Sequence, residues 1–280
     1  MAKKTVLITG CSDGGMGAAL AISFAEAGLY VYATARDVSK MSRLSHTSIE
    51  KIALDITSPE SIAACVSTVP KLDILVNNAG SSYSMPITDL SIDSAKQLFD
   101  VNVWAQLAVT RAFLPLLLHS GGMVVNQTSV VAVAAVPFQS AYNASKAAMS
   151  MFSDCLRLEL EPFGIKVIDL KTGAVATNLI RNQKTLTSLT LPSDSMYDPA
   201  RDAVESAMRN DKMAGMGTAA DEWAKEVAGD LLKKNPPLVI WRGYNAKIAR
   251  LGTFFPYGML DSTIKKMTGL DVVQERLRVT

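Results

Sequence analysis

The sequence predicts an α/β protein with a doubly wound, parallel sheet of seven strands and helices on both of its faces. Short runs rich in Val, Ile and Leu alternate with longer helical segments along the chain, which is the pattern of parallel sheets built from strand–helix–strand units. A glycine-rich turn follows the first of these strands. The chain has 280 residues, of which 49% are hydrophobic and 19% are charged. We therefore expect one large globular domain over residues 1–280.

The expected strands are short runs of apolar and β-branched residues. They lie at residues 4–9, 30–35, 51–56, 72–80, 121–129, 164–173 and 237–243. Helices are expected between the strands, and Ser58 followed by Pro59 marks the start of one of them. The expected helical ranges are 18–28, 58–69, 91–118 and 140–161.

The segment 178–236 interrupts this alternation. It is polar, rich in Thr, Ser, Met and Asp, and it contains Pro192 and Pro199 as breakers. An insertion before the last strand lies at the carboxyl edge of a parallel sheet, where ligands bind in such folds. We therefore expect a lid over the substrate, built around helices near 199–210 and 219–234.

Composition excludes several classes of protein. The formal net charge of +2 is too small to indicate binding of nucleic acid or of acidic substrates. Cys11, Cys65 and Cys155 lie far apart and form no CxxC pair, so neither a disulfide framework nor a metal site is indicated. The first residues, MAKK, lead straight into a strand and leave no room for a signal peptide, and no run of about 18 apolar residues predicts a membrane span. We expect a reduced, cytoplasmic protein.

The stretch from Asn126 to Met149 indicates chemistry. Tyr142 and Lys146 are four residues apart, so a helix places them one turn from each other on one face. A lysine ammonium close to a phenol lowers the tyrosine pKa, which starts at about 10, and such a phenol exchanges protons with a carbonyl or an alcohol. Ser129 lies 13 residues before Tyr142, far enough for a loop to bring its hydroxyl beside the phenol. Alone, this pattern is weak, because Tyr and Lys are common on solvated helix faces.

A cofactor site is expected at the first strand-to-helix turn. The turn contains Gly10, Gly14, Gly15 and Gly17. Glycines there allow positive φ and close approach of the backbone to a phosphate, and the helix N-terminus favours an anion.

The end of the second strand indicates which dinucleotide binds. Arg36 directly follows the strand, and the acid Asp37 comes only after it. An acid at this place holds the ribose 2′-hydroxyl of NAD, whereas an arginine accommodates the 2′-phosphate of NADP. We therefore expect NADPH/NADP⁺, and the alternative is that Arg36 is a solvated loop residue.

Together these residues resemble the short-chain dehydrogenase/reductase family. The resemblance spans roughly residues 4–180 and the strand at 237–243. Its motifs stand in family order: TGCSDGGMG at 9–17, NNAG at 77–80, Asn102, Ser129 with YNASK at 142–146, and GAVAT at 173–177. The resemblance implies a Rossmann-type fold and an oxidoreductase that acts on CH–OH and C=O groups with a nicotinamide cofactor.

The resemblance also implies a role for each catalytic residue. Tyr142 would be the general acid of reduction, and Lys146 would hold the nicotinamide ribose and lower the tyrosine pKa. Ser129 would hydrogen-bond the substrate carbonyl. Asn102 would bend its helix around a water that relays protons to Lys146; the alternative for Asn102 is a helix-interior side chain satisfied by backbone.

Further residues are implied to bind the cofactor. Asp55 would contact the adenine, and Val175 and Thr177 would meet the nicotinamide carboxamide. The full set of expected cofactor residues is Gly10, Ser12, Gly15, Met16, Gly17, Arg36, Asp55, Ile56, Asn78, Ala79, Gly80, Tyr142, Lys146, Val175 and Thr177. The glycine turn is one residue longer than the family's usual turn, which leaves the phosphate contacts open among Cys11, Ser12 and Asp13. Thr172 replaces the family's usual proline and adds a hydroxyl near the nicotinamide.

Within the family, the long turn, Arg36 and the segment WRGYNAKIARLGTFFP are most similar to fungal NADPH-dependent 1-acyldihydroxyacetone-phosphate reductases. This implies reduction of a ketone on a lipophilic substrate to a secondary alcohol. The alternatives are a polyketide-type ketoreductase of specialised metabolism, a hydroxysteroid-type dehydrogenase and, from another class, a catalytically silent NADP-sensing regulator. Adaptable apolar side chains are expected in the pocket wall and lid. They are Phe138, Met149, Met196, Met208, Met213 and Met216.

The surface suggests partners other than the substrate. The tail from 244 to 280 begins with basic residues interleaved with Phe254 and Phe255, which suits a membrane surface. We favour a tail that packs on its own domain or at a subunit contact, and keep peripheral binding to an intracellular membrane as the alternative. The helices at 91–118 and 140–161 are apolar over more than one face, which predicts a homodimer or homotetramer.

Overall fold

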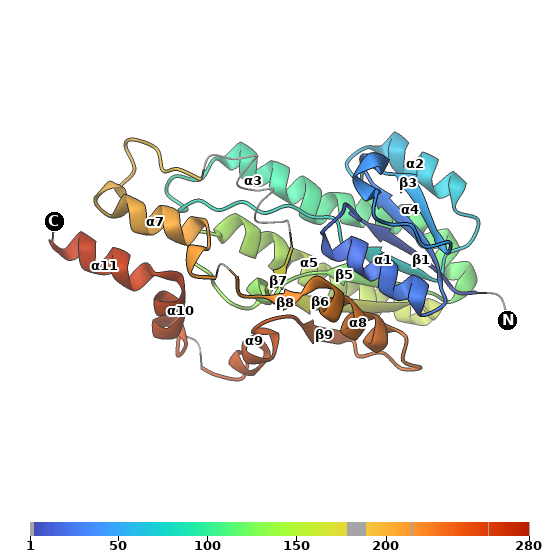
Figure 1. The fold of residues 1–280 in the computed structure, drawn as a ribbon. Helices are drawn as coiled ribbons and strands as arrows, with labels where there is room; N and C mark the ends of the chain where they lie inside the picture. The colour runs from blue at the N-terminus through green and yellow to red at the C-terminus, as the bar shows by residue number, and fades with distance from the viewer. Residues whose placement is uncertain (1–2, 178–188, 214, 257, 280) are drawn as a thin grey trace.

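The computed structural model describes residues 3–177, 189–213, 215–256 and 258–279. Its centre is a seven-stranded sheet in the order β3-β2-β1-β4-β5-β6-β9, and every neighbouring pair is parallel (Figure 1). The strands are β1 Thr5–Thr9, β2 Tyr30–Ala35, β3 Ile49–Ala53, β4 Ile74–Asn77, β5 Met123–Gln127, β6 Lys166–Thr172 and β9 Val239–Arg242. The predicted doubly wound fold and its seven strands are confirmed.

Helices cover both faces of this sheet. On one face α1 (Met16–Glu26) and α8 (Ala220–Leu231) share a buried core with the sheet, in which Phe24 and Trp223 are fully buried. On the other face α2 (Pro59–Thr68), α4 (Ala105–Ser120) and α5 (Ser140–Leu160) pack on the alternate side chains of the strands. Each fully buried Leu, Ile or Phe contributes about 1.5–3 kcal/mol to folding, so these two layers hold the sheet rigid. A rigid sheet fixes the place of the loops at its carboxyl edge.

The position of α8 corrects the predicted lid. The expected lid ran through residue 236 and included a helix near 219–234. Helix α8 lies there, but it packs against α1 and buries Trp223, Ala224 and Val227 in the core of the sheet. It is the crossover helix before β9 and does not cover a substrate. Residues 178–188 of the expected lid lie outside the described residues.

A cap stands over the carboxyl edge of the sheet. It consists of α7 (Arg201–Met208) and the C-terminal helices α9 (Ala246–Gly252), α10 (Asp261–Thr268) and α11 (Leu270–Val279). Figure 1 shows α7, α10 and α11 together at the end of the molecule away from the N-terminus. A separate small core ties this cap to the loop before α5. Its members are Phe138, Leu189, Leu191, Ala200, Val204, Met208 and Val273.

One long helical run crosses the molecule from Ile92 to Ser120. It comprises α3 (Ile92–Phe99), a π-helical turn (Asp100–Trp104) and α4. By length and composition it could cross a membrane, although the sequence analysis predicted no such run. Phe113 and Leu117 are fully buried against the sheet. A helix that packs in a protein core is as apolar as one that crosses a membrane, and this helix packs in the core.

The remaining described elements are short. A two-stranded parallel sheet, β7 (Val175–Ala176) with β8 (Thr218–Ala219), joins the end of β6 to the start of α8. The sequence did not predict it. The 3₁₀ turns are Val38–Met41, Val130–Ala132, Glu161–Phe163, Asp198–Ala200 and Asp211–Met213.

Candidate active site

A cavity of about 1690 Å³ lies at the carboxyl ends of the strands, between the sheet and the cap. All but two of the residues expected in the site line it, although they come from elements far apart in the sequence. They are Gly10, Ser12, Gly15, Met16, Arg36, Asp55, Ile56, Asn78, Ala79, Gly80, Ser129, Tyr142, Lys146, Val175 and Thr177. The two exceptions are Gly17 and Asn102.

The glycine turn brings backbone to the cavity. Gly10 has φ 77°, and a Cβ there would lie 2.8 Å from the Ala79 Cα, so only glycine fits. Gly15 is the N-cap of α1, and no side chain caps the N–H groups of the first turn. Those N–H groups and the helix dipole favour a phosphate. The turn therefore fits a dinucleotide.

The structure narrows the phosphate contacts that the long turn left open. Cys11 points into the core, where its thiol donates to the Ile8 carbonyl and burial raises its pKa to about 12. The Asp13 carboxylate accepts from the Ser42 hydroxyl at 2.7 Å. Ser12 and Asp13 line the cavity and Cys11 does not.

Gly17 has a packing role. A Cβ at this residue would lie 2.5 Å from the Gly10 carbonyl oxygen and 2.6 Å from Asn78 Nδ2. Gly17 does not line the cavity, and its expected contact with the cofactor stays a prediction. Glycine is needed there because the first turn of α1 passes so close to the ends of β1 and β4.

The ends of β1 and β4 are clamped together by Thr9 and Asn78. The Thr9 hydroxyl accepts from the backbone N–H groups of Asn78 and Ala79, and Asn78 Nδ2 donates to the carbonyls of Thr9 and Gly10. Asn78 Oδ1 is buried and has no hydrogen-bond partner in the described part of the chain. Such an orphaned acceptor beside a cavity fits a site completed by a ligand.

Arg36 and Asp37, the two residues after β2, have different surroundings. Arg36 is exposed and lines the cavity. The Asp37 carboxylate caps the following 3₁₀ turn, where it accepts from the backbone N–H and the hydroxyl of Ser39. The Asp55 carboxylate accepts hydrogen bonds from the backbone N–H and the hydroxyl of Thr57. These bonds, together with the positive charge of Arg36, lower the pKa of the Asp55 carboxyl.

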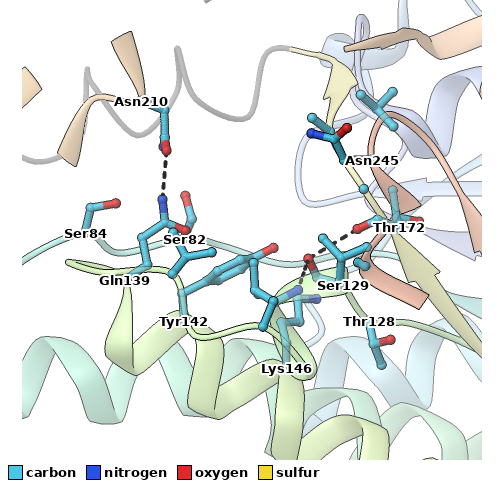
Figure 2. A pocket seen from close by; sticks show the side chains of 18 of the residues that line it. Ser82, Ser84, Thr128, Ser129, Gln139, Tyr142, Lys146, Thr172, Asn210 and Asn245 are labelled. Carbon is cyan, nitrogen blue, oxygen red and sulfur yellow. Dashed lines mark hydrogen bonds between the residues drawn. The ribbon is translucent and has the colours of Figure 1, made fainter. Parts of the chain in front are cut away.

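Ser129 and Tyr142 both line the cavity and lie beside each other, as Figure 2 shows. The Ser129 hydroxyl donates to the Thr172 carbonyl at 3.2 Å and accepts from the Val131 N–H. Burial raises the pKa of Tyr142 to about 12, and a hydrogen bond with Ser129 opposes part of that rise. The expectation that Lys146 lowers this pKa is not met in the protein alone, where desolvation of the phenolate raises the pKa and the opposing influence comes from Ser129.

Lys146 is buried one helical turn beyond Tyr142. Its ammonium donates to the Gln127 carbonyl at 2.8 Å and lies 5.9 Å from the centroid of the Tyr142 ring. Burial lowers the pKa of Lys146 to about 8, and the negative charge of Asp169 opposes part of that fall. The amine therefore changes charge near neutral pH.

Asn102 supports the site from behind. It is fully buried in the π-helical turn, at the place where the sequence predicted a bend. Its Oδ1 accepts from the backbone N–H of Ser81, and its Nδ2 donates to the Ser81 carbonyl and to the Ser145 hydroxyl. Asn102 does not line the cavity. A Cβ at Gly80 would lie 3.2 Å from Asn102 Oδ1 and 3.7 Å from Lys146 Nζ, so glycine keeps these two side chains close.

A buried ion pair between Asp169 and Lys171, near Lys146, was not predicted. The Asp169 carboxylate accepts from Lys171 Nζ at 2.5 Å and from the hydroxyls of Thr128 and Ser150. Lys171 Nζ also donates to the Ser150 hydroxyl, which lies one turn beyond Lys146 on α5. The sequence does contain a signal for this pair. Asp169 and Lys171 carry opposite charges and lie two residues apart, on one face of a strand that was expected to be buried.

The substrate half of the cavity differs from the expected one. Of the expected apolar side chains only Met216 lines it. Phe138, Met149 and Met208 are core residues, Met196 is exposed, and the Met213 side chain lies outside the described residues. The cap's C-terminal helices and the connection from α9 to α10 supply the wall instead, a role that was not predicted for them. Their apolar contributors are Ile248, Phe255, Leu260, Ile264, Met267 and Val272.

Two polar side chains that line the cavity, Gln139 and Asn210, are joined near Tyr142. Gln139 donates to Asn210 Oδ1 at 3.1 Å across the cavity (Figure 2). No group of His, Cys, Asp and Glu in the described residues is arranged to hold a metal ion.

Comparison with known proteins agrees with this geometry. Residues 4–186 match the family model described as short chain dehydrogenase. A short-chain dehydrogenase/reductase from Pestalotiopsis microspora is 70% identical over 278 residues, which cover 99% of this chain and 98% of the relative. The NADPH-dependent 1-acyldihydroxyacetone phosphate reductase of Schizosaccharomyces pombe is 35% identical over 96% of this chain and 95% of its own length.

Solved structures share the fold. A short-chain dehydrogenase from Streptomyces avermitilis is 29% identical, covers 98% of both chains and gives a TM-score of 0.77. One from Burkholderia cenocepacia, solved in complex with NADP, is 24% identical over 94% of this chain and 97% of that one, with a TM-score of 0.73, and shows the same fold. The chain therefore belongs to the short-chain dehydrogenase family, whose members are oxidoreductases acting on alcohol and ketone groups.

Proposed function

We propose that the protein is an NADPH-dependent reductase that converts a ketone on a lipophilic substrate to a secondary alcohol. The observation that carries this proposal is the position of Tyr142. Its phenol lies beside Ser129 in the cavity that the glycine turn and the cap both line. A carbonyl placed there has a proton donor beside it and a cofactor cradle on its other side.

The raised pKa of Tyr142 suits an acid. With a pKa of about 12 the phenol stays protonated at neutral pH and is ready to give its proton to a carbonyl oxygen. Ser129 would hydrogen-bond that oxygen and hold it in line. The Lys146 ammonium, close to the ring, would stabilise the phenolate that remains. Bound NADPH would supply the hydride.

Arg36 supports NADPH over NADH. It lines the cavity and is exposed, whereas Asp37 is occupied in capping the following turn. A guanidinium at this place pairs with a 2′-phosphate as a planar fork. The Schizosaccharomyces pombe relative is named as NADPH-dependent, which agrees with the preference. Gly10, Gly15 and the N-terminus of α1 would hold the pyrophosphate.

The apolar wall of the cap supports a lipophilic substrate. Apolar side chains from several segments of the chain line this half of the cavity, from Val133 and Val136 before α5 to Val272 in α11. The Schizosaccharomyces pombe relative is named for an acylated ketone phosphate, and the hydroxysteroid and polyketide-type ketones are the other lipophilic classes to test.

Two exposed apolar stripes support a homodimer, or a homotetramer built from it. Trp104 and Leu118 lie on the outer side of the long helical run, and Met151 and Leu158 lie on the outer side of α5. The two stripes adjoin, because the Trp104 ring packs edge-on against Phe152 at 5.9 Å between centroids. A symmetry-related copy would cover both.

The test of this proposal is NADPH oxidation with a panel of carbonyl compounds. The panel holds an acyldihydroxyacetone phosphate, a steroid ketone, an aromatic polyketide-like ketone and a long-chain aldehyde. Oxidation with one ketone class identifies the substrate. Tight NADPH binding without turnover of any carbonyl would support a nucleotide-sensing protein and contradict the reductase.

A further inference from the structure

A patch of apolar side chains stands at the rim of the cavity, and we call it the rim surface. It is formed by Leu251, Phe254 and Met259, in α9 and in the connection from α9 to α10, which are 58%, 75% and 58% exposed. None of the three lines the cavity. Large apolar side chains exposed in one short segment indicate a surface that is covered in use.

Basic side chains lie on the two helices that carry and flank the rim surface. Lys247 and Arg250 lie on α9, Lys265 and Lys266 lie on α10, and all four are exposed. None of them forms an ion pair with the residues that the structure describes. Asp261 is the single acid between residues 245 and 270, so the segment carries a charge of +3 where the whole chain carries +2. A partner for this surface is therefore both apolar and negatively charged.

We propose that the rim surface docks on an anionic phospholipid bilayer. Leu251, Phe254 and Met259 would enter the boundary between head groups and acyl chains, and the four cations would contact the lipid phosphates. Each cation near such a surface strengthens binding roughly fivefold. This changes the expectation for the tail: its helices do pack on their own domain, but they leave this surface uncovered.

A second copy of the chain fits the rim surface less well. In a two-fold dimer the same patch faces itself. That would bring two clusters of four cations together with one carboxylate each, and like charges across an interface weaken it. The stripes on α4 and α5 carry no comparable excess of charge and suit a dimer contact.

Docking would place the cavity mouth on the bilayer. Phe255, Pro256 and Gly258 belong to the same connection and line the cavity. A lipophilic ketone could then pass from the membrane to Tyr142 without crossing water. This consequence rests on the proposed reductase function, whereas the docking itself does not.

Vesicle flotation tests the docking with the full-length protein. We expect the protein to float with vesicles of phosphatidylcholine and phosphatidylserine, and to bind vesicles of phosphatidylcholine alone at least tenfold more weakly. The Leu251→Asp/Phe254→Asp variant and the Lys265→Gln/Lys266→Gln variant should each lose at least tenfold in binding to the anionic vesicles. Ile92→Asp is the matched control, because Ile92 is also exposed but lies at the start of α3.

The outcomes separate docking from catalysis. Both double variants should reduce a short, water-soluble ketone at the wild-type rate without vesicles, because none of their residues lines the cavity. Absence of wild-type binding to anionic vesicles, or binding by the Leu251→Asp/Phe254→Asp variant equal to wild type, overturns the docking. So does conversion of a dimer to a monomer by that variant without any change in vesicle binding, which would assign the rim surface to a subunit contact.

Discussion

The Lys146 ammonium donates a hydrogen bond to the Gln127 carbonyl at 2.8 Å and lies 5.9 Å from the centroid of the Tyr142 ring. Lys146 is buried and Tyr142 is partly buried, and desolvation favours the neutral form of each. It raises the pKa of Tyr142 to about 12 and lowers that of Lys146 to about 8. The protein alone thus holds a protonated acid beside an amine whose charge depends on pH.

The first prediction concerns pH. The kcat/KM for NADPH in the direction of reduction should be level below pH 8 and should fall above it, because Lys146 loses its charge as pH rises through its pKa of about 8. Tyr142 stays protonated over the same range, so it contributes no second fall. The measurement is kcat/KM between pH 6 and about 10. In Lys146→Arg the activity is lower, but the fall above pH 8 should vanish; a fall that persists would assign it to another group.

The second prediction concerns cofactor choice. Arg36→Ala should weaken NADPH binding about 10- to 100-fold, since a charge-assisted contact to the 2′-phosphate is lost. NADH binding should change less than about threefold, because NADH has no phosphate for Arg36 to hold. Fluorescence titration gives both dissociation constants. An equal loss for the two cofactors would show that Arg36 acts through the fold of the turn.

The third prediction concerns the buried pair of Asp169 and Lys171. Lys171→Met should lower the free energy of unfolding by about 3–5 kcal/mol, because it leaves the Asp169 carboxylate buried without its cation. Asp169→Asn/Lys171→Met should recover most of that loss. Urea unfolding measures both, with Lys166→Met as control, since Lys166 is exposed on the same strand. A double variant as unstable as the single one would refute the pairing argument.

The fourth prediction concerns assembly. Met151→Asp places a charge in the outer stripe of α5 and should convert the dimer to a monomer in sedimentation equilibrium at micromolar concentration. Ile87→Asp changes an equally exposed side chain that lies outside the stripes and should leave the dimer intact. A wild-type protein that sediments as a monomer would refute the dimer itself.

The strands, the glycine turn and the groups around Tyr142 could be predicted from the sequence because their signals are local. Apolar runs mark the strands. The four-residue spacing of Tyr142 and Lys146 places them on one helix face, whatever packs around that helix. Helix α8 shows a different case. Its apolar residues Trp223, Val227 and Leu231 recur at helical spacing, but the polar composition of the surrounding segment suggested a lid.

Other features depend on tertiary contacts that no local pattern contains. The pKa of Tyr142 is set by how completely neighbouring elements exclude water from the phenol. Gly17 belongs to the same motif as Gly10, yet it packs against the Gly10 carbonyl and Asn78 and does not line the cavity. The last helix of the cap is held at the cavity in part by Val273, which joins the small core around Phe138.

The most direct test of the central claim is NADPH oxidation by Tyr142→Phe with a ketone that the wild-type protein reduces. Removing the phenolic proton should lower kcat by about 10²- to 10⁴-fold. NADPH affinity should stay within about threefold, because the glycine turn and Arg36 remain. Turnover by Tyr142→Phe equal to that of the wild type would contradict the assignment of Tyr142 as the proton donor.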